Sequence, residues 1–381
     1  MKNYLIVLCL LLVSNLSAQQ WQMASPDGKI QMRIHSGENL GYSVSYNGKT
    51  LVCDSPLGFE FKGEKPMSGG FTLVNTPSME AKSDTWVPVV KNKHGKVKVS
   101  WNEMTLALKE GAGDRRRMDF IVRVYDDGIA FRYQLYGARK IGNRQITREL
   151  TGFSLPVNAI GWAAKYKRNY TSSQEAEFVP TRLGVLPVDT VVGLPFLVEI
   201  DKQDYIAITE AHIDDYPGFY IGKSDGGQEG RQMLVTKLSP LPGEKEDGVK
   251  ACFCEKKATP WRVIMIGNHP GKFIESELVY SLNPPCALDD TSWIKPGMCA
   301  WDHWWSGEVK METSVIKEYI DFASEQGWPY MLIDWQWYGP YNKVEADITK
   351  PAPTTEYAGN TGLCPLEERA LLVMAVLYGC E

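Results

Sequence analysis

The sequence predicts a multi-domain β and α/β protein, in which an N-terminal antiparallel β-sandwich precedes an α/β segment. Three observations support this prediction. Apolar and polar residues alternate along much of residues 20–285, turn dipeptides separate the alternating runs, and the pattern changes to strand, helix and strand beyond residue 285. Alternation of period 2 is typical of antiparallel strands with one buried face, whereas a strand–helix–strand pattern indicates parallel strands.

The first strands are predicted from short alternating runs. Ile30, Met32 and Ile34 alternate with polar residues, and a further run ends at Asn47-Gly48. Another run enters Asp126-Asp127-Gly128 and continues beyond it, which predicts a hairpin of residues 118–125 and 129–134. Asn-Gly and Asp-Gly favour the tight turns that join antiparallel strands. Many such runs without a convincing long helix predict a large β-sandwich.

Beyond residue 285 the pattern is that of a βαβ unit. Residues 297–301 predict a buried strand, residues 313–326 carry apolar side chains at helical spacing up to Gly327, and residues 330–333 predict a second strand that ends at Asp334. Such a unit has parallel strands and a right-handed crossover. A (β/α)₈ barrel usually needs ~250 residues, more than follow residue 290. The segment is therefore either a small appendage or the start of a barrel inside which the chain stops.

Residues 1–18 predict a secretory signal peptide. Lys2 precedes an apolar run over residues 4–13, and Ser17-Ala18 supplies the small residues of a cleavage site. The run is too short to cross a hydrocarbon core of ~30 Å, and no other stretch reaches that length. We therefore expect a periplasmic or secreted protein without a membrane span.

Composition narrows the function classes. The chain has 41 basic and 46 acidic residues and a net charge of −5, and Arg115-Arg116-Arg117 is its one basic block. A nucleic-acid partner is therefore not expected. Hydrophobic residues make up 44% of the chain, which excludes a disordered protein. The sequence also lacks the short signatures of serine hydrolases, zinc peptidases, phosphate-binding loops and EF-hands.

Acidic and aromatic residues gather at the two predicted strand ends beyond residue 285. Trp301 ends the first strand, Asp302 and Trp304 come after it, and Asp334 and Trp337 follow the second. Sugar rings stack on indoles through their C–H faces, while carboxylates accept hydrogen bonds from sugar hydroxyls. We predict that these five residues bind a saccharide. The alternative is that the tryptophans only pack against neighbouring structure.

Two acidic residues lie in a predicted loop of the sandwich. Glu175 and Glu177 follow the polar stretch Tyr170-Thr-Ser-Ser, and their carboxylates are suitable ligands for a hard cation such as calcium. A solvated surface pair is the alternative on these residues alone. Glu210, at the end of a predicted strand, leaves the same two interpretations open.

Several longer segments together resemble glycoside hydrolase family 97. The resemblance extends from about residue 20 to about residue 355. The residues that carry it are Ser25-Pro-Asp-Gly28, Asp127-Gly-Ile-Ala-Phe-Arg-Tyr133, Thr209-Glu-Ala-His-Ile-Asp-Asp-Tyr-Pro-Gly218, Trp261-Arg-Val-Ile-Met-Ile-Gly267, Leu282-Asn-Pro-Pro-Cys286, Asp290-Thr-Ser-Trp-Ile-Lys-Pro-Gly297, Ala300-Trp-Asp302 and Tyr319-Ile-Asp-Phe-Ala323.

The resemblance implies a β-supersandwich that precedes a (β/α)₈ catalytic barrel, of which this chain would hold an incomplete part. The implied divisions are a signal peptide at 1–18, the sandwich at 19–288, the first βα units at 289–357 and an aberrant tail at 358–381. The resemblance also implies a calcium ion ligated by a loop glutamate of the sandwich, here matched to Glu175 with Glu177 as its rival. The catalytic carboxylates of the family come from later barrel strands and are expected to be missing from this chain.

Two hypotheses of function follow. The first is a truncated exo-acting α-glycoside hydrolase, an α-glucosidase or α-galactosidase that acts on terminal sugars of oligosaccharides or polysaccharides. The second is a non-catalytic carbohydrate-binding module formed by the β-sandwich. A structural β-protein of the cell surface is a weaker third interpretation, because it does not explain the tryptophans between residues 293 and 337.

Overall fold

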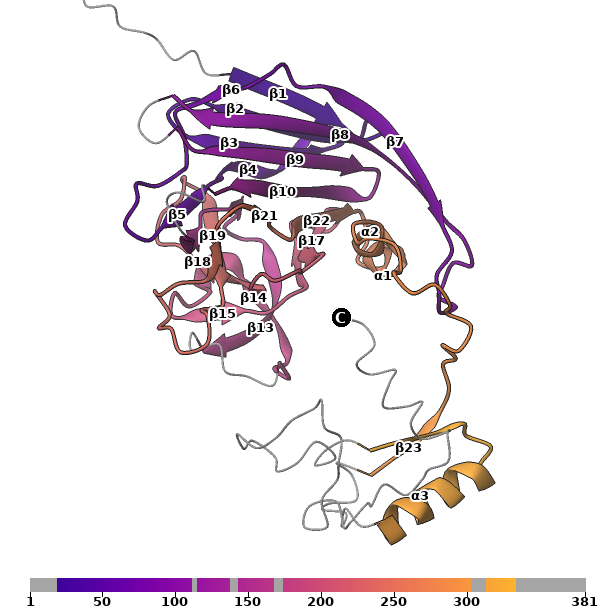
Figure 1. Ribbon diagram of the computed structural model, residues 1–381. Helices are drawn as coiled ribbons and strands as arrows, with labels where there is room; N and C mark the ends of the chain where they lie inside the picture. Colours follow the sequence, from indigo (N-terminus) through magenta and orange to yellow (C-terminus); the bar gives the residue numbers. More distant parts are fainter. Residues whose placement is uncertain (1–18, 112–114, 138–142, 168–173, 303–312, 334–381) are drawn as a thin grey trace, which may run out of the picture. The chain divides into compact units, whose positions relative to one another are not determined.

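The computed structural model describes residues 19–111, 115–137, 143–167, 174–302 and 313–333. Its contacts divide the chain into two units (Figure 1). Within the described residues, the first unit comprises the chain up to Val87 and Lys93–Pro285, and the second comprises Pro88–Asn92 and the residues from Cys286 onward. The predicted change of pattern near residue 285 falls at this division, while the outer limits predicted for the domains remain predictions.

The first unit consists almost wholly of β-strands. They are β1 (Gln19–Ala24), β2 (Ile30–Ser36), β3 (Leu40–Tyr46), β4 (Lys49–Pro56), β5 (Phe59–Phe61), β6 (Phe71–Leu73), β7 (Met79–Trp86), β8 (Val97–Glu110), β9 (Arg117–Tyr125), β10 (Gly128–Tyr136), β11 (Arg144–Glu149), β12 (Gly152–Pro156), β13 (Ile160–Lys167), β14 (Phe178–Arg182), β15 (Thr190–Val192), β16 (Phe196–Glu199), β17 (Tyr205–Ala211), β18 (Phe219–Lys223), β19 (Arg231–Leu238), β20 (Ala251–Phe253), β21 (Lys256–Ala258) and β22 (Trp261–Gly267). A 3₁₀ turn, η2 (Leu183–Val185), and two short helices, α1 (Gly271–Glu275) and α2 (Leu278–Ser281), complete the unit.

The strands form two large layers, and every strand pair described in this unit is antiparallel. One layer runs in the order β1-β2-β3-β4-β12-β19-β18-β15. The other runs β7-β8-β9-β10-β22-β17-β16-β13-β14. A small third sheet contains β5, β11 and β20. The predicted antiparallel β-sandwich is therefore confirmed.

Strand β13 joins the two layers. Its first residues pair with β16, as in Trp162 opposite Leu197, whereas its last residues pair with β15, as in Lys165 opposite Val192. The same strand therefore belongs to one layer at its start and to the other at its end. This connection holds the two layers together at one side of the sandwich.

Two predicted hairpins are present, but their turns work differently. Asn47 and Gly48 join β3 to β4 with φ values of 49° and 80°, the left-handed conformations that a type I′ turn requires. In the hairpin of β9 and β10 the turn residues are Asp126 and Asp127, and Gly128 already pairs with Tyr125. The hairpin prediction is confirmed, although Gly128 lies in the strand and not in the turn.

Gly128 is required by close packing. A Cβ atom at this position would lie 2.6 Å from the carbonyl oxygen of Ile264 and 3.1 Å from a methyl carbon of Leu278. The glycine therefore lets β10 approach β22 on one side and α2 on the other. Distances this short cannot be relieved by a side-chain rotation alone, because one of the atoms belongs to the backbone.

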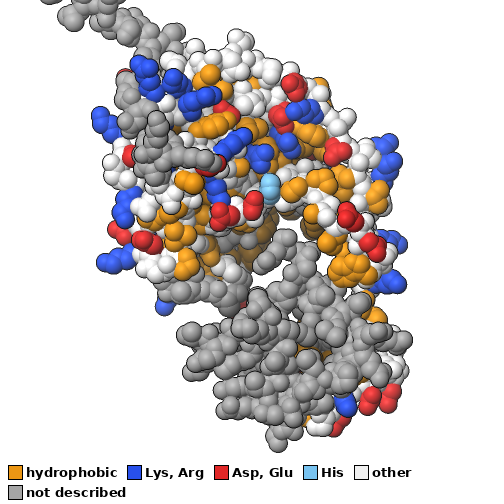
Figure 2. All heavy atoms as spheres, viewed as in Figure 1, with side chains coloured by type: hydrophobic (Ala, Val, Ile, Leu, Met, Phe, Trp, Pro, Cys, Tyr) orange, Lys and Arg blue, Asp and Glu red, His pale blue; other side chains and the backbone are white. Residues whose placement is uncertain are grey.

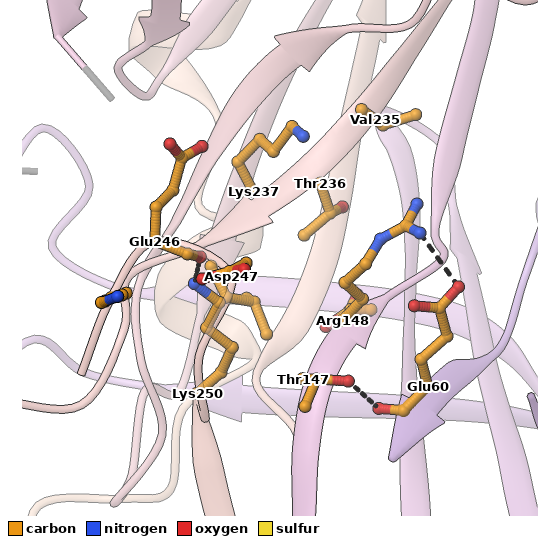
Figure 3. Close-up of a pocket in the computed structure, with 12 residues that line it drawn as sticks. Glu60, Thr147, Arg148, Val235, Thr236, Lys237, Glu246, Asp247 and Lys250 are labelled. Carbon is orange, nitrogen blue, oxygen red and sulfur yellow. Dashed lines mark hydrogen bonds and ion pairs between the residues drawn. The ribbon is translucent and has the colours of Figure 1, made fainter. Parts of the chain in front are cut away.

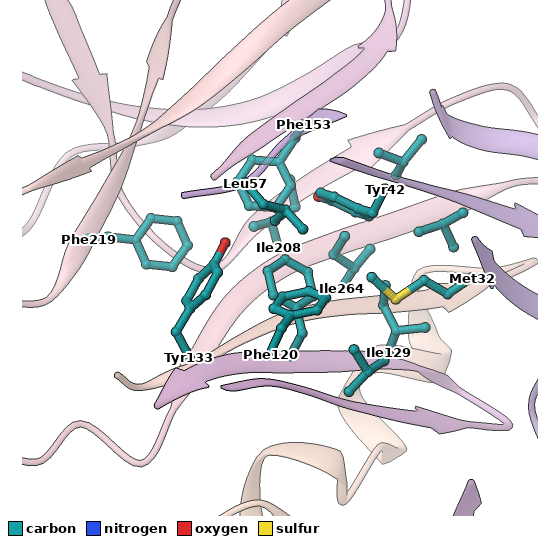
Figure 4. Close-up of a cluster of buried hydrophobic side chains, with 14 of the residues drawn as sticks. Met32, Tyr42, Leu57, Phe120, Ile129, Tyr133, Phe153, Ile208, Phe219 and Ile264 are labelled. Atoms are coloured by element: carbon teal, nitrogen blue, oxygen red, sulfur yellow. The ribbon is translucent and has the colours of Figure 1, made fainter. Parts of the chain in front are cut away.

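The main core fills the space between the layers. Figure 4 shows Met32, Tyr42 and Phe153 from one layer facing Phe120, Ile129 and Ile264 from the other. All six side chains are at most 1% exposed. Burying an apolar side chain of this size stabilises the fold by ~1.5–3 kcal/mol. The alternation of apolar residues in the sequence is thus the pattern of side chains that enter this core.

The second unit contains a parallel strand pair. Strand β23 (Cys299–Trp301) precedes helix α3 (Thr313–Glu325), which precedes β24 (Tyr330–Leu332). Cys299 lies opposite Tyr330 and Trp301 opposite Leu332 in parallel register. The predicted βαβ unit is confirmed. Ile316 of the helix and Ala300 and Met331 of the strands form its small buried core.

Helix α3 ends in a Schellman motif. Gly327 has a φ of 68°, its N–H donates to the carbonyl of Ser324 at 3.0 Å, and the N–H of Trp328 donates to the carbonyl of Ala323 at 2.8 Å. The Trp328 ring then packs edge-on against Phe322, with ring centroids 5.5 Å apart. This is the hydrogen-bond and apolar-contact pattern that a glycine beyond the helix end permits.

Basic and acidic side chains are interspersed over the face of the molecule in Figure 2. Among the described helices, the apolar length needed to cross a membrane is not reached.

We expect Gly128→Ala to lower the free energy of unfolding by about 1–3 kcal/mol, the usual cost of overpacking a core. Gly95→Ala is the control, because a Cβ at Gly95 meets no atom within 4 Å. Urea denaturation of both variants measures the difference. Equal stability of the two variants would contradict the close approach of β10 to β22.

Candidate functional site

The first predicted site residues lie at the end of β23. Trp301 is the last residue of the strand and is 38% exposed, whereas Asp302 follows it directly and is 1% exposed. The C-terminal ends of parallel strands are where barrel enzymes carry their site residues. Asp302 therefore has the expected place in the chain, but it is buried beside its strand. Trp304, Asp334 and Trp337 lie outside the described residues.

The two predicted calcium ligands lie on the surface of the sandwich. Glu175 and Glu177 are exposed and belong to the segment that leads into β14. The start of this segment is held by hydrogen bonds: the Gln174 side-chain amide donates to the hydroxyl of Tyr220, and the N–H of Ala176 donates to the hydroxyl of Tyr166 at 3.4 Å. The two tyrosine rings contact each other edge-on. The backbone is therefore anchored while both carboxylates remain accessible.

A calcium ion takes six to eight oxygen ligands, so two carboxylates can supply only part of a site. Within the described ranges, three or more His, Cys, Asp or Glu side chains do not gather in a metal-binding arrangement. Glu175 and Glu177 could therefore contribute ligands to a calcium ion, with the remaining oxygens supplied by other groups or by water.

A buried ion cluster lies between β11, β17 and β22. Arg262 is fully buried and binds Glu149 through two hydrogen bonds, from Nε at 2.8 Å and from a terminal nitrogen at 2.6 Å. Its other terminal nitrogen donates to Glu210 at 2.7 Å. The guanidinium also lies 4.5 Å from the centroid of the Phe219 ring. Bidentate geometry of this kind makes the strongest arginine–carboxylate pairs.

Hydrogen bonds extend the cluster into both layers. The Thr151 hydroxyl donates to Glu149 at 2.8 Å and is hydrogen-bonded in turn to the Tyr133 hydroxyl at 2.8 Å. The other oxygen of Glu210 accepts the N–H of Phe219 at 3.1 Å. Every carboxylate oxygen of the cluster thus has a donor, which a buried charge requires.

Burial determines the electrostatics of this cluster. It raises the pKa of Glu210, an effect that the Arg262 guanidinium opposes. Burial acts to lower the pKa of Arg262, but the adjacent Glu149 carboxylate outweighs it and the net shift is upward. Burial and the Glu149 charge raise the pKa of the Tyr133 hydroxyl well above its usual range. Arg262 therefore stays charged and Tyr133 stays neutral across the physiological range.

Glu210 is thus neither a solvated surface residue nor an available metal ligand, the two interpretations that the sequence left open. It links Phe219, the first residue of β18, to Arg262 of β22. Sequence reasoning missed the cluster, although one signal was present: Arg262 interrupts the otherwise apolar run of β22. A charge in a strand buried along its whole length demands an ionised partner.

Comparison with known proteins places the chain among the glycoside hydrolases. Residues 23–285 match the family model described as Glycosyl-hydrolase 97 N-terminal. The chain belongs to this family, as the sequence resemblance predicted.

Two curated relatives extend beyond this chain. It is 28% identical over 357 residues to a retaining alpha-galactosidase of Bacteroides thetaiotaomicron, covering 87% of this chain and 52% of that protein. It is also 28% identical over 336 residues to a probable retaining alpha-galactosidase of Streptomyces bingchenggensis, covering 86% of this chain and 47% of that protein. The chain therefore spans about half the length of the curated relatives it matches.

Solved structures give the same result. A family 97 enzyme from Pseudoalteromonas sp. strain K8 in complex with acarbose superimposes with a TM-score of 0.71 at 25% identity, covering 85% of this chain and 48% of that one. An E480Q form of a family 97 enzyme from the same strain, in complex with panose, also gives 0.71 at 25% identity, covering 89% and 53%. Acarbose and panose are oligosaccharides, so these relatives bind oligosaccharides.

We expect Arg262→Met to cost about 3–5 kcal/mol of unfolding free energy, because Glu149 would be left buried without its cation. Arg148→Met is the matched control: Arg148 pairs with Glu60 at 2.9 Å, but its side chain is 59% exposed, so its loss should cost at most about 1 kcal/mol. Urea denaturation measures both.

The double variant Arg262→Met with Glu149→Leu separates charge from packing. If the uncompensated charge causes the loss, the double variant is more stable than Arg262→Met alone, since apolar replacements of buried ion pairs are often neutral. A double variant less stable than the single one would show that packing dominates.

Proposed function

We propose that this chain belongs to an exo-acting α-glycosidase that removes terminal sugars from oligosaccharides or polysaccharides, with α-galactosides as the favoured substrates. The observation that carries the proposal is the family match over residues 23–285. It is joined to two curated relatives, one named as a retaining alpha-galactosidase and the other as a probable retaining alpha-galactosidase. In a retaining enzyme one carboxylate forms a glycosyl-enzyme intermediate and a second acts as acid and base. Both are proposed to lie outside the residues of this chain.

The predicted site residues receive specific roles in this proposal. Trp301 offers an exposed indole on which a sugar ring can stack, and Asp302, which follows it directly, is proposed to belong to the same sugar-binding site. Trp304, Asp334 and Trp337 are proposed to complete the sugar-binding surface. Glu175 is proposed as a calcium ligand, with Glu177 as its rival, because both carboxylates are exposed on an anchored backbone. Residues 1–18 are proposed to direct export to the periplasm or the medium.

A carbohydrate-binding module remains the second candidate. The observation that favours it is the sandwich itself, which has an extensive core of its own between its two layers. A domain with its own core can fold and bind a ligand without an attached catalytic domain.

The two candidates differ in turnover. Hydrolysis of nitrophenyl α-galactoside and α-glucoside is measured on this chain and on any longer protein that contains it. We expect the longer protein to prefer the galactoside, and this chain alone to be at least ~10²-fold slower, the usual contribution of a general acid. Comparable turnover by this chain would show that it holds the catalytic groups. Saccharide binding without turnover in either protein would favour the module.

Calcium binding tests the loop carboxylates separately. Titration of the full chain with calcium chloride should show binding that Glu175→Gln weakens about tenfold, because a neutral amide is a poorer ligand than a carboxylate for a hard cation. Glu177→Gln is the matched comparison, because Glu177 is two residues away and is also exposed. A larger loss in Glu177→Gln would assign the ligand to that residue, and unchanged affinity in both variants would contradict a calcium site here.

A further inference from the structure

The outer face of β8, β9, β10 and β21 carries an excess of positive charge. Alternate residues of these strands point away from the core, and their registers place them side by side. The charged side chains on this face are the cations Lys109, Arg117, Arg123, Arg132 and Lys256 and the acids Glu103 and Asp119. The face is therefore positive, although the chain as a whole has a net charge of −5.

Both acids of this face already have hydrogen-bond donors. Glu103 accepts from the ammonium of Lys82 at 2.6 Å and from Nε of Arg123 at 2.6 Å. Asp119 accepts from the hydroxyl of Tyr136 at 2.6 Å. One carboxylate thus serves two cations, and the other is bound to a neutral group.

Arg132 of β10 has no acidic partner. Its Nε atom is buried without a hydrogen bond, and within the described ranges its terminal nitrogens make neither a hydrogen bond nor an ion pair. The side chain is only partly buried, so these terminal nitrogens remain open to a ligand. Arg148 of β11 shows the usual arrangement, because its guanidinium lies 2.9 Å from the carboxylate of Glu60 (Figure 3).

A second guanidinium adds to the positive charge at this place. Arg132 lies over the Trp261 ring, 4.4 Å from its centroid, and Arg123 lies 4.7 Å from the centroid of the same ring. Burial lowers the pKa of Arg132, and the charge of Arg123 lowers it further. An indole attracts a cation through its quadrupole but carries no net charge. The ring therefore cannot neutralise the two arginines.

We propose that Arg132, with Arg123 beside it, binds an oxyanion: the carboxylate, sulfate or phosphate group of a small ligand. An oxyanion supplies the charge that Arg132 lacks, whereas a neutral ligand would leave that charge uncompensated. The N–H donors of a guanidinium match the paired oxygens of such a group. Access is open on the neighbouring strand, where Thr105, in register with Arg132 through Ile121, is exposed. This site is separate from the proposed sugar-binding and calcium sites, and it does not depend on hydrolysis.

Titration calorimetry of the full chain tests the proposal, with sulfate, inorganic phosphate, acetate and galacturonate as probes. Sodium chloride keeps the ionic strength constant, so that general screening does not change between probes. We expect saturable binding of at least one probe. Arg132→Gln should weaken it about tenfold or more, because a hydrogen bond to a charged group is lost.

Two further variants make this result specific. Arg132→Lys keeps the charge but loses the paired donors, so its affinity should lie between those of the parent and Arg132→Gln. Arg33→Gln is the matched control, because Arg33 is exposed in β2 of the other layer. It should bind as the parent does. Circular dichroism verifies the fold of each variant, and if Arg132→Gln does not fold, the weakening in Arg132→Lys decides the test.

The outcomes are distinct. Absence of saturable binding of every probe would overturn the proposal, as would binding that the Arg132 variants leave unchanged. Equal losses in Arg132→Gln and Arg33→Gln would overturn it too, since they would show only a general attraction of anions. A preference for acetate and galacturonate would support the site and identify a carboxylate ligand, whereas a preference for sulfate and phosphate would support it and identify an ester of those acids.

Discussion

The charge of Arg262 is the constraint on which the centre of the sandwich depends. A guanidinium that is wholly removed from water must be matched by ionised partners, and the fold supplies them from two other strands. Glu149 comes from the small third sheet, and Glu210 comes from the strand that pairs with β22. Each carboxylate can reach the guanidinium only when its strand is in register. The cluster therefore selects one arrangement of three strands, in a way that apolar contacts alone do not.

Local features of the fold could be predicted because short segments determine them. The Asn47-Gly48 turn and the end of α3 at Gly327 follow from the φ angles that these residues adopt easily. The alternation along β2 fixes which side chains enter the core. The order of strands could not be predicted, because β4 pairs with β12 and β10 with β22 across long stretches of chain. Nothing in a single strand specifies a partner that distant.

The candidate site was predictable to the same limited extent. The βαβ pattern predicts that β23 and β24 are parallel. It also predicts that Asp302 lies at the end of a strand. The burial of Asp302 and the exposure of Glu175 depend on tertiary contacts that no motif encodes. Glu210 illustrates the same limit, since its role became clear only once Arg262 was found beside it.

The strand that the two layers share has a mechanical consequence. Separating either layer from β13 breaks the hydrogen bonds at one end of this strand. A shift of register at one end of β13 also shifts the register at its other end. The two layers therefore cannot move independently of each other. The two layers are therefore coupled through β13, and a change of register in one layer is transmitted to the other.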